Sequence, residues 1–362
     1  MLSLVKEIMK MKKLNVALAI LVTAVMAGNA QVSSEPVGYV NVKIIAGTGT
    51  AKKLSYISFP LLDKDVSAGK TRGTITGVTS TTISDSTAGW TAGALSAPAT
   101  PYVIGITSGT AVGRIFHISS SAITAGAVGT TANTATTVTI SSLDTTSGTD
   151  PVAAGVTVGD SYEIYGCDTL ASLLGSPSTT GVLSGVSATV ADSVVMIVNG
   201  TAATFFHNGT RWTKVTVGSP DASNTPVLPY YGLAYSRLKN TDITLTTLGT
   251  VPTKARKTQI KNSGITLFSQ YFPVDTTLLS LGLQNTPGWN SNASSALADK
   301  VVLVSNGTAS TYWYSGTGWK KVTVGSPSAD TTAISAGSMV YVNKYGSTSG
   351  FSTYSLPLPY TL

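Results

Sequence analysis

An internal repeat constrains the fold of this chain more than any other feature of its sequence. Residues 192–220 align without a gap with residues 299–327, and 18 of the 29 aligned positions are identical. At the same spacing of 107 residues, DTLASLLG from Asp168 corresponds to DTTLLSLG from Asp275. Self-similarity at a fixed spacing is typical of duplicated structural units. We therefore expect two copies of one unit.

The two copies differ at one place. In the second copy Phe272-Pro273 runs directly into DTTLLSLG, whereas in the first copy about a hundred residues separate SFPLLDKD, at residues 58–65, from DTLASLLG. Loop insertions cost little when the ends of the loop lie close together. We interpret the extra residues as a separate β module. The predicted organisation is a signal peptide at 1–30, a first β repeat unit at 31–67 plus 165–240, an inserted β module at 68–164 and a second β repeat unit at 241–362.

Composition and local pattern both favour strands. Charged residues make up only 11% of the chain, whereas exposed helices draw on Glu, Lys and Gln for their polar face. Runs rich in Val and Thr, separated by Gly, Ser and Asn, are typical of short strands. Only residues 169–174 and 276–281 look helical. The sequence predicts an all-β fold with a duplicated antiparallel β-sandwich or barrel-like unit and a small β-barrel-like module inserted in the first copy.

Each copy contains a predicted hairpin with paired aromatic residues. Asn208-Gly209 and Ser315-Gly316 favour two-residue type I′ turns, in which both central residues need a positive φ. Such turns place Phe205 opposite Trp212 and Tyr312 opposite Trp319. If the valines that follow each tryptophan face the core, the aromatic pairs face outward. The candidate ligand platform then comprises Phe205, Trp212, Lys214, Tyr312, Trp319 and Lys321.

Two interpretations of these aromatic residues remain open. Exposed rings with a neighbouring lysine suit the binding of sugar rings or anionic groups. Alternatively, cross-strand aromatic pairs stabilise the hairpin or lie beneath another layer, as is common in sheets.

The N-terminal residues have the pattern of a secretory signal peptide. Lys10, Lys12 and Lys13 precede an apolar run that ends at Ala27, and small residues at Gly28 and Ala30 suit cleavage before Gln31. The apolar run is shorter than the roughly 20 residues that a membrane-spanning helix needs. We expect export to the periplasm, the cell surface or the extracellular space, with membrane contact only through the leader.

Charge and cysteine content exclude some classes of function. The formal net charge of +7 falls to about +4 without residues 1–30, and the remaining basic residues form no dense cluster. This distribution argues against nucleic-acid binding. The single cysteine, Cys167, excludes an internal disulfide framework. Val274 stands at the corresponding position of the second copy, which favours a buried apolar role for Cys167.

The residues needed for catalysis or metal binding are few. The chain has two histidines, His117 and His207, both in strand-like runs, and it lacks the HExxH, GxSxG and paired-cysteine motifs. We assign no catalytic residue, no metal ligand and no cofactor. A hydrolase built from aspartates that lie far apart in the chain stays a remote alternative.

Several segments together resemble a known family. They are EPVGYVNV from Glu35, YVIGITSGTAVGRIFHI from Tyr102 and two copies of NGTxxTxxxxxGTxWxKV. The chain resembles an uncharacterised family of exported β-rich proteins found chiefly in Verrucomicrobia and related bacteria. The resemblance implies export and an envelope or extracellular location, and it transfers no catalytic residues. His207 departs from the family pattern, in which an aromatic residue commonly stands there.

The sequence leads to an ordered set of functional hypotheses. The first is an exported, non-enzymatic cell-envelope or extracellular structural or adhesion protein, with polysaccharide or other envelope proteins as partners. The alternative is a carbohydrate-binding protein that uses the aromatic platforms of the two copies. The sequence leaves the oligomeric state open.

Overall fold

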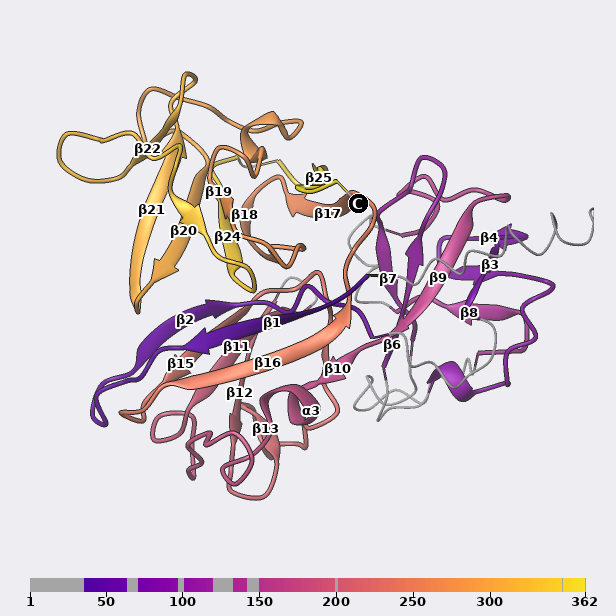
Figure 1. Ribbon diagram of the computed structural model, residues 1–362, viewed down its shortest axis with the longest axis horizontal. Helices are drawn as coiled ribbons and strands as arrows, with labels where there is room; N and C mark the ends of the chain where they lie inside the picture. The colour runs from indigo at the N-terminus through magenta and orange to yellow at the C-terminus, as the bar shows by residue number, and fades with distance from the viewer. Residues whose placement is uncertain are drawn as a thin grey trace, which may run out of the picture. The chain divides into compact units, whose positions relative to one another are not determined.

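Antiparallel strands make up most of the regular structure in the computed structural model (Figure 1). The structure describes residues 36–63, 71–96, 101–119, 133–141, 150–198, 201–346 and 348–361. The expected signal peptide lies outside the described residues. The all-β prediction is confirmed, and the sheets in these ranges are open. The finer expectation of sandwich or barrel-like units stays a prediction.

The first copy is built around a five-stranded sheet with the order β13-β12-β11-β15-β2. Strand β1 alternates between exposed and buried side chains from Tyr39 to Ile44, which is the period of two that a half-buried strand requires. The elements of this copy are β1 (Val37–Ile44), β2 (Lys53–Ile57), β10 (Asp168–Thr169), α3 (Leu170–Leu174), β11 (Ser193–Val198), β12 (Thr201–His207), β13 (Trp212–Lys214), β14 (Pro226–Val227), β15 (Leu233–Arg237) and β16 (Ile243–Thr250).

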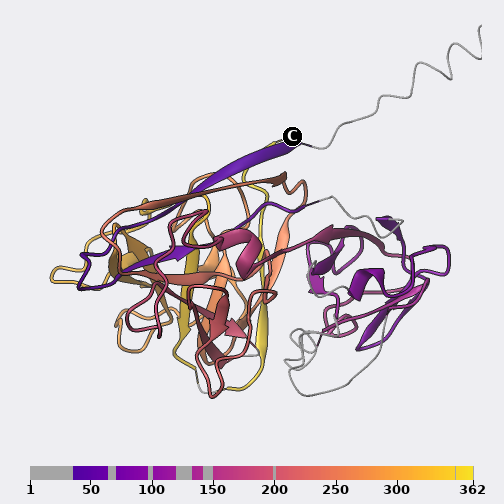
Figure 2. The ribbon, with the colours of Figure 1, turned by 90° about the horizontal axis from the view of Figure 1, so that it is seen from below.

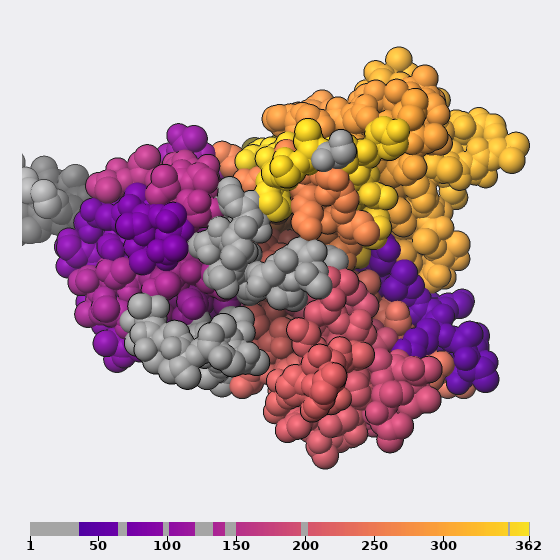
Figure 3. Space-filling view, turned by 180° about the vertical axis from the view of Figure 1, so that it is seen from behind, coloured from indigo at the N-terminus to yellow at the C-terminus, as the bar shows by residue number. Residues whose placement is uncertain are grey.

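The second copy repeats this sheet in the order β22-β21-β20-β24-β18. In Figure 3 its C-terminal residues, in yellow, lie against orange residues of the same copy, as the pairing of β25 with β17 requires. The elements are β17 (Arg256–Lys261), β18 (Gly264–Ser269), β19 (Thr276–Thr277), η2 (Leu283–Asn285), β20 (Lys300–Ser305), β21 (Thr308–Tyr314), β22 (Trp319–Lys321), β23 (Ala333–Ile334), β24 (Met339–Lys344) and β25 (Phe351–Leu356).

Strand pairing extends the correspondence beyond the segments that are similar in sequence. Strand β1 pairs with β16, and in the second copy β17 pairs with β25. The short pairs β10–β14 and β19–β23 also correspond. Pairing therefore groups β16, at Ile243–Thr250, with the first copy, although these residues follow the expected start of the second unit at 241.

The residues between β2 and β10 form sheets of their own. They make a four-stranded sheet, β3-β9-β6-β7, and a three-stranded sheet, β4-β5-β8, around a separate group of buried side chains that includes Trp90 and Phe116. Figure 2 shows these strands, in purple to magenta, gathered as one group. The elements are β3 (Arg72–Thr74), β4 (Gly77–Val78), β5 (Thr82–Ser84), η1 (Ala94–Ser96), β6 (Tyr102–Ile106), β7 (Ile115–His117), β8 (Thr137–Thr139) and β9 (Ser161–Gly166).

The first helical prediction matches the structure and the second does not. Helix α3 begins after Thr169, whose hydroxyl accepts a hydrogen bond from Ser172 N while Ser172 Oγ accepts one from Thr169 N. This reciprocal capping box stabilises a first helical turn. In the second copy Leu279 stands at the position of Ser172 and offers no such hydroxyl. Residues 276–281 accordingly form β19 and a turn.

The two copies contact each other through equivalent backbone groups. Ser58 N donates to Gly337 O at 2.7 Å, and Ser269 N donates to Tyr230 O at 3.2 Å. Tyr230 and Gly337 are separated by the repeat spacing of 107 residues. Single β-bridges next to these bonds join Ile57 to Ser338 and Phe268 to Tyr231. Each copy thus gives the other the same contact, as subunits of a two-fold dimer do.

A buried ion pair occurs at the same place in each copy. In the first copy Asp192 accepts from Arg237 Nη1 at 2.6 Å, and both side chains are almost fully buried. Asp192 also accepts from the backbone N–H groups of Leu183, at 3.0 Å, and Leu238, at 2.8 Å. Tyr235 donates its hydroxyl to the same carboxylate. The carboxylate joins the loop before β11 to the end of β15.

The second copy reproduces this arrangement with lysine in place of arginine. Asp299 accepts from Lys344 Nζ and from the backbone N–H of Tyr345 at 2.8 Å. Lys344 Nζ also donates to Gly288 O at 2.7 Å and lies 4.9 Å from the centre of the Trp289 ring. A buried charge is tolerated only when it is paired and hydrogen-bonded. Each carboxylate therefore fixes one loop to one strand end.

Removal of either carboxylate should destabilise the fold strongly. We expect Asp192→Ala and Asp299→Ala each to lower the free energy of unfolding by about 3–5 kcal/mol, because each leaves a buried cation without its partner. Urea denaturation followed by tryptophan fluorescence measures this change. Lys43→Met, which breaks the exposed pair with Asp242, is the control and should leave the midpoint nearly unchanged. Equal midpoints for all three variants would contradict the assigned role.

Candidate functional site

The hairpin turns lie one residue later than the sequence predicted. The observed register pairs Phe205 with Lys214 and His207 with Trp212, so the expected opposition of Phe205 and Trp212 is wrong. Asn208 Oδ1 accepts from the backbone N–H groups of Thr210 and Arg211, both at 3.0 Å. This local capping by the asparagine side chain selects a turn other than type I′. In the second copy Tyr314, not Tyr312, pairs with Trp319.

The aromatic residues of the predicted platform are buried. Trp212 and Trp319 expose 1% and 0% of their surfaces, and Phe205 and Tyr312 are buried beside them. Trp212 Nε1 donates to Gly175 O at 2.8 Å, and the His207 ring packs edge-on against the indole at 5.8 Å. The expected outward orientation is therefore wrong, and these rings form the cores of the two copies.

The second copy shows the same packing with different partners. Trp319 Nε1 donates to Gln284 Oε1 at 3.2 Å, and the Tyr314 ring packs against its indole at 5.6 Å. The Trp289 ring also packs against the Trp319 indole, with ring centroids 5.7 Å apart. Of the two lysines in the predicted platform, Lys214 is exposed and Lys321 is half-buried. Neither lysine has an exposed aromatic partner from the platform.

The valines that were expected in the core lie in an exposed loop instead. Strand β13 ends at Lys214 and β22 ends at Lys321. Val215 N and Val322 N still donate to the neighbouring strands, and the residues after them leave the sheet. The loops at 214–220 and 321–327 share the sequence KVTVGSP. At their tips Val217 and Val324 are each 99% exposed. Sequence reasoning missed these residues because it extended the strand beyond the lysine.

A tight turn holds each of these tips in the same conformation. Ser219 N donates to Thr216 O at 3.0 Å, and Ser326 N donates to Thr323 O at 3.1 Å. Gly218 and Gly325 have φ values of 79° and 78°, a conformation that glycine adopts without steric cost. We call these two segments, 214–220 and 321–327, the twin loops. They are the candidate functional surface, because each presents a valine to solvent in a defined geometry.

The histidines and the cysteine occupy structural positions. His117 lies within β7 and is fully buried, and burial lowers its pKa to about 3. Burial also lowers the pKa of His207, whose Nδ1 accepts from Gly209 N at 3.1 Å. Burial and the nearby charges of Asp168 and Asp63 raise the pKa of the Cys167 thiol. These shifts favour the neutral form of each group.

Among the described residues there is no group of three or more His, Cys, Asp or Glu side chains placed to hold a metal ion. In the same part of the chain, no helix is both long enough and apolar enough to cross a membrane.

Substitution of the buried tryptophans should affect stability. We expect Trp212→Ala and Trp319→Ala each to lower the free energy of unfolding by about 3–5 kcal/mol, because each removes a large buried side chain. Lys214→Ala, at an exposed position two residues after Trp212 in the same strand, should change stability little. Denaturant titration of the three variants measures the difference. A tryptophan variant as stable as the wild type would show that the ring is not part of a core.

The protein should lose stability in acid through His117 in strand β7. Its pKa is about 3 in the folded protein against about 6.5 in the unfolded chain, so only the unfolded chain takes up a proton between these values. The free energy of unfolding therefore carries no penalty from His117 above pH 6.5. It falls by about 1.4 kcal/mol for each pH unit below that value, down to about pH 3. Urea titrations at pH 7, 6 and 5 should show a shallower decline for His117→Phe than for the wild type. Parallel declines would refute this assignment.

Comparison of the chain with protein-family models, with curated proteins and with solved structures finds no match.

Proposed function

We propose that this chain is an exported, non-enzymatic structural or adhesion protein of the cell envelope or the extracellular space. The twin loops are the observation that carries this proposal. Each copy presents one loop at the same position of its sheet, next to the edge strand β13 or β22. We further propose that each copy is a sandwich-like unit whose role is to hold its loop in place.

The physical properties of the twin loops suit attachment to a partner. A fully exposed valine gains free energy when a partner covers it. The turn geometry fixes the valine before binding, so little conformational entropy is lost on contact. Because both loops belong to one chain, two weak contacts can combine into a much stronger one. Polysaccharide chains and other envelope proteins are the proposed partners, and both can offer repeated contacts.

The positions of the reactive side chains support a role without catalysis. Asp192 and Asp299, two of the most buried carboxylates described, are engaged by backbone N–H groups and cations that hold the fold together. His117 stays neutral because burial lowers its pKa, and His207 packs on a core tryptophan. We do not propose that Trp212 and Trp319 bind carbohydrate, because both rings are buried.

A sedimentation assay with isolated envelopes tests the adhesive role. We expect the purified protein to co-sediment with envelopes from the producing cells. Val217→Ser and Val324→Ser should each weaken binding about tenfold, and the double variant more than either, because bivalent attachment is lost. Val186→Ser is the matched control, since Val186 is 93% exposed but lies outside the twin loops. Equal binding of the double variant and the control would contradict the proposal.

Localisation is a separate test. Fractionation of the producing cells should place the protein in the envelope or the culture medium, with residues 1–30 removed. A protein found in the cytoplasm with its N-terminus intact would overturn the proposed export.

A further inference from the structure

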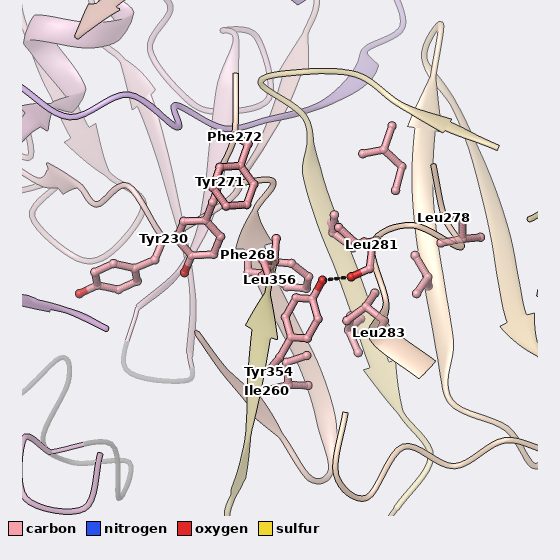
Figure 4. Close-up of a cluster of buried hydrophobic side chains, with 14 of the residues drawn as sticks. Tyr230, Ile260, Phe268, Tyr271, Phe272, Leu278, Leu281, Leu283, Tyr354 and Leu356 are labelled. Atoms are coloured by element: carbon pink, nitrogen blue, oxygen red, sulfur yellow. Dashed lines mark hydrogen bonds between the residues drawn. The ribbon is translucent and has the colours of Figure 1, made fainter. Parts of the chain in front are cut away.

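The second copy contains a cavity beside strand β19 and the end of strand β25. It has a volume of about 330 Å³, which lies within the range of about 300–1,000 Å³ that small-molecule sites occupy. Its apolar wall includes Phe272, Leu281 and Leu356, which belong to the buried cluster drawn in Figure 4. Tyr354 donates its hydroxyl to Leu281 O and so joins Leu281 to strand β25 (Figure 4). The apolar side is thus preformed.

The polar side of the cavity offers hydrogen-bonding groups. Gln270 lines the cavity and is 1% exposed, and its Nε2 donates to Val274 O at 2.8 Å. Its Oε1 is buried and accepts no hydrogen bond from any described residue. Because this oxygen is buried, a molecule in the cavity cannot reach it, and Gln270 shapes the wall without binding the occupant. The hydrogen-bonding groups that face the cavity are therefore those of other lining side chains.

Three further side chains line the cavity with polar groups. Asp275 is exposed at the cavity, and its Oδ1 accepts from Ala336 N at 2.9 Å, which orients the carboxylate. Thr277 Oγ1 donates to Ser280 Oγ at 2.9 Å, so the Ser280 hydroxyl can donate its own proton to a ligand. The lining therefore combines strong acceptors with a hydroxyl that both donates and accepts.

The corresponding place in the first copy is nearly closed. Phe59 and Asp168, the counterparts of Phe272 and Asp275, line a cavity of only about 30 Å³. Asp63 and Gly166, which form a β-bridge where the chain leaves and re-enters the first copy, also line it. The chain segments that lead into the inserted module therefore take up space that is open in the second copy. The duplication thus supplies an internal comparison for the open cavity.

We propose that the cavity of the second copy binds one neutral sugar ring. Ring hydroxyls are donors for the exposed Asp275 carboxylate and acceptors for Ser280. The C–H face of the ring fits the exposed apolar edge that Pro357 and Pro359 give the cavity. Among the described residues that line the cavity, Asp275 alone is charged, and its negative charge disfavours anionic ligands. This site is separate from the buried aromatic residues and from the twin loops.

Saturation-transfer NMR on the purified protein tests this site. The probes are free glucose, galactose, mannose and N-acetylglucosamine, each at millimolar concentration, with gluconate as an anionic and ethanolamine as a cationic comparison. We expect saturation transfer to the ring protons of at least one neutral sugar. Ser280→Trp, which fills the cavity from an exposed position, should reduce this signal at least tenfold. Asp275→Asn should weaken it about threefold or more.

Matched variants separate loss of the site from loss of the fold. Ser178→Trp adds the same side chain at an exposed position of the first copy and should leave the sugar signal unchanged. The double variant Val217→Ser and Val324→Ser should also bind the sugar normally, so failure of the adhesion proposal is distinguishable from failure of this one. The proposal is overturned if no neutral sugar gives a signal, if Ser280→Trp binds as well as wild type, or if gluconate or ethanolamine binds better than every sugar.

Discussion

The fold of each copy depends on one buried carboxylate. Asp192 and Asp299 begin the most similar segments of the repeat, and each is desolvated by burial. The cost of that burial is offset because each of these two carboxylates accepts hydrogen bonds from backbone N–H groups and from a cation. The loop before the central strand and the end of the neighbouring strand meet at this point. Arginine and lysine both serve as the cation, since each reaches the carboxylate and a backbone carbonyl.

The arrangement of the copies explains how the chain accommodates a large insertion. The reciprocal backbone bonds between the copies come from β2 and the residue after it, from β18, and from the residues just before β15 and β24. The extra residues begin after these contacts, and the chain returns to the first copy at β10. Asp63 and Gly166 form a β-bridge between the two ends of this insertion. The duplicated sheets therefore keep the same strand order with or without it. The local difference is the cavity beside Asp168, which is smaller than the corresponding cavity of the second copy.

The sequence is enough to predict the all-β fold class, but it does not predict which residues are exposed. Alternating polar and apolar residues in β1 and the short apolar runs at β11 and β20 predict strands, because both patterns are local. The turn at Asn208 was misplaced because the asparagine side chain bonds to Thr210 and Arg211, a competition that the Asn-Gly signal does not reveal. The outward orientation expected for Trp212 is wrong because β13 ends at Lys214, so Val217 lies in the exposed loop and does not cover a core. The cavity joins residues 270–281 to residues 356–359, a contact that no local pattern contains.

The reciprocal contact between the copies has a consequence for behaviour at high dilution. Two separate chains joined by such a contact would dissociate as their concentration fell below the dissociation constant. In this protein Ser58 and Ser269 belong to one polypeptide, so the contact forms at a fixed effective concentration, of millimolar order for short flexible linkers. The paired state then depends on folding alone and is independent of how many molecules are present. Duplication within a single gene product thus makes the assembly insensitive to dilution.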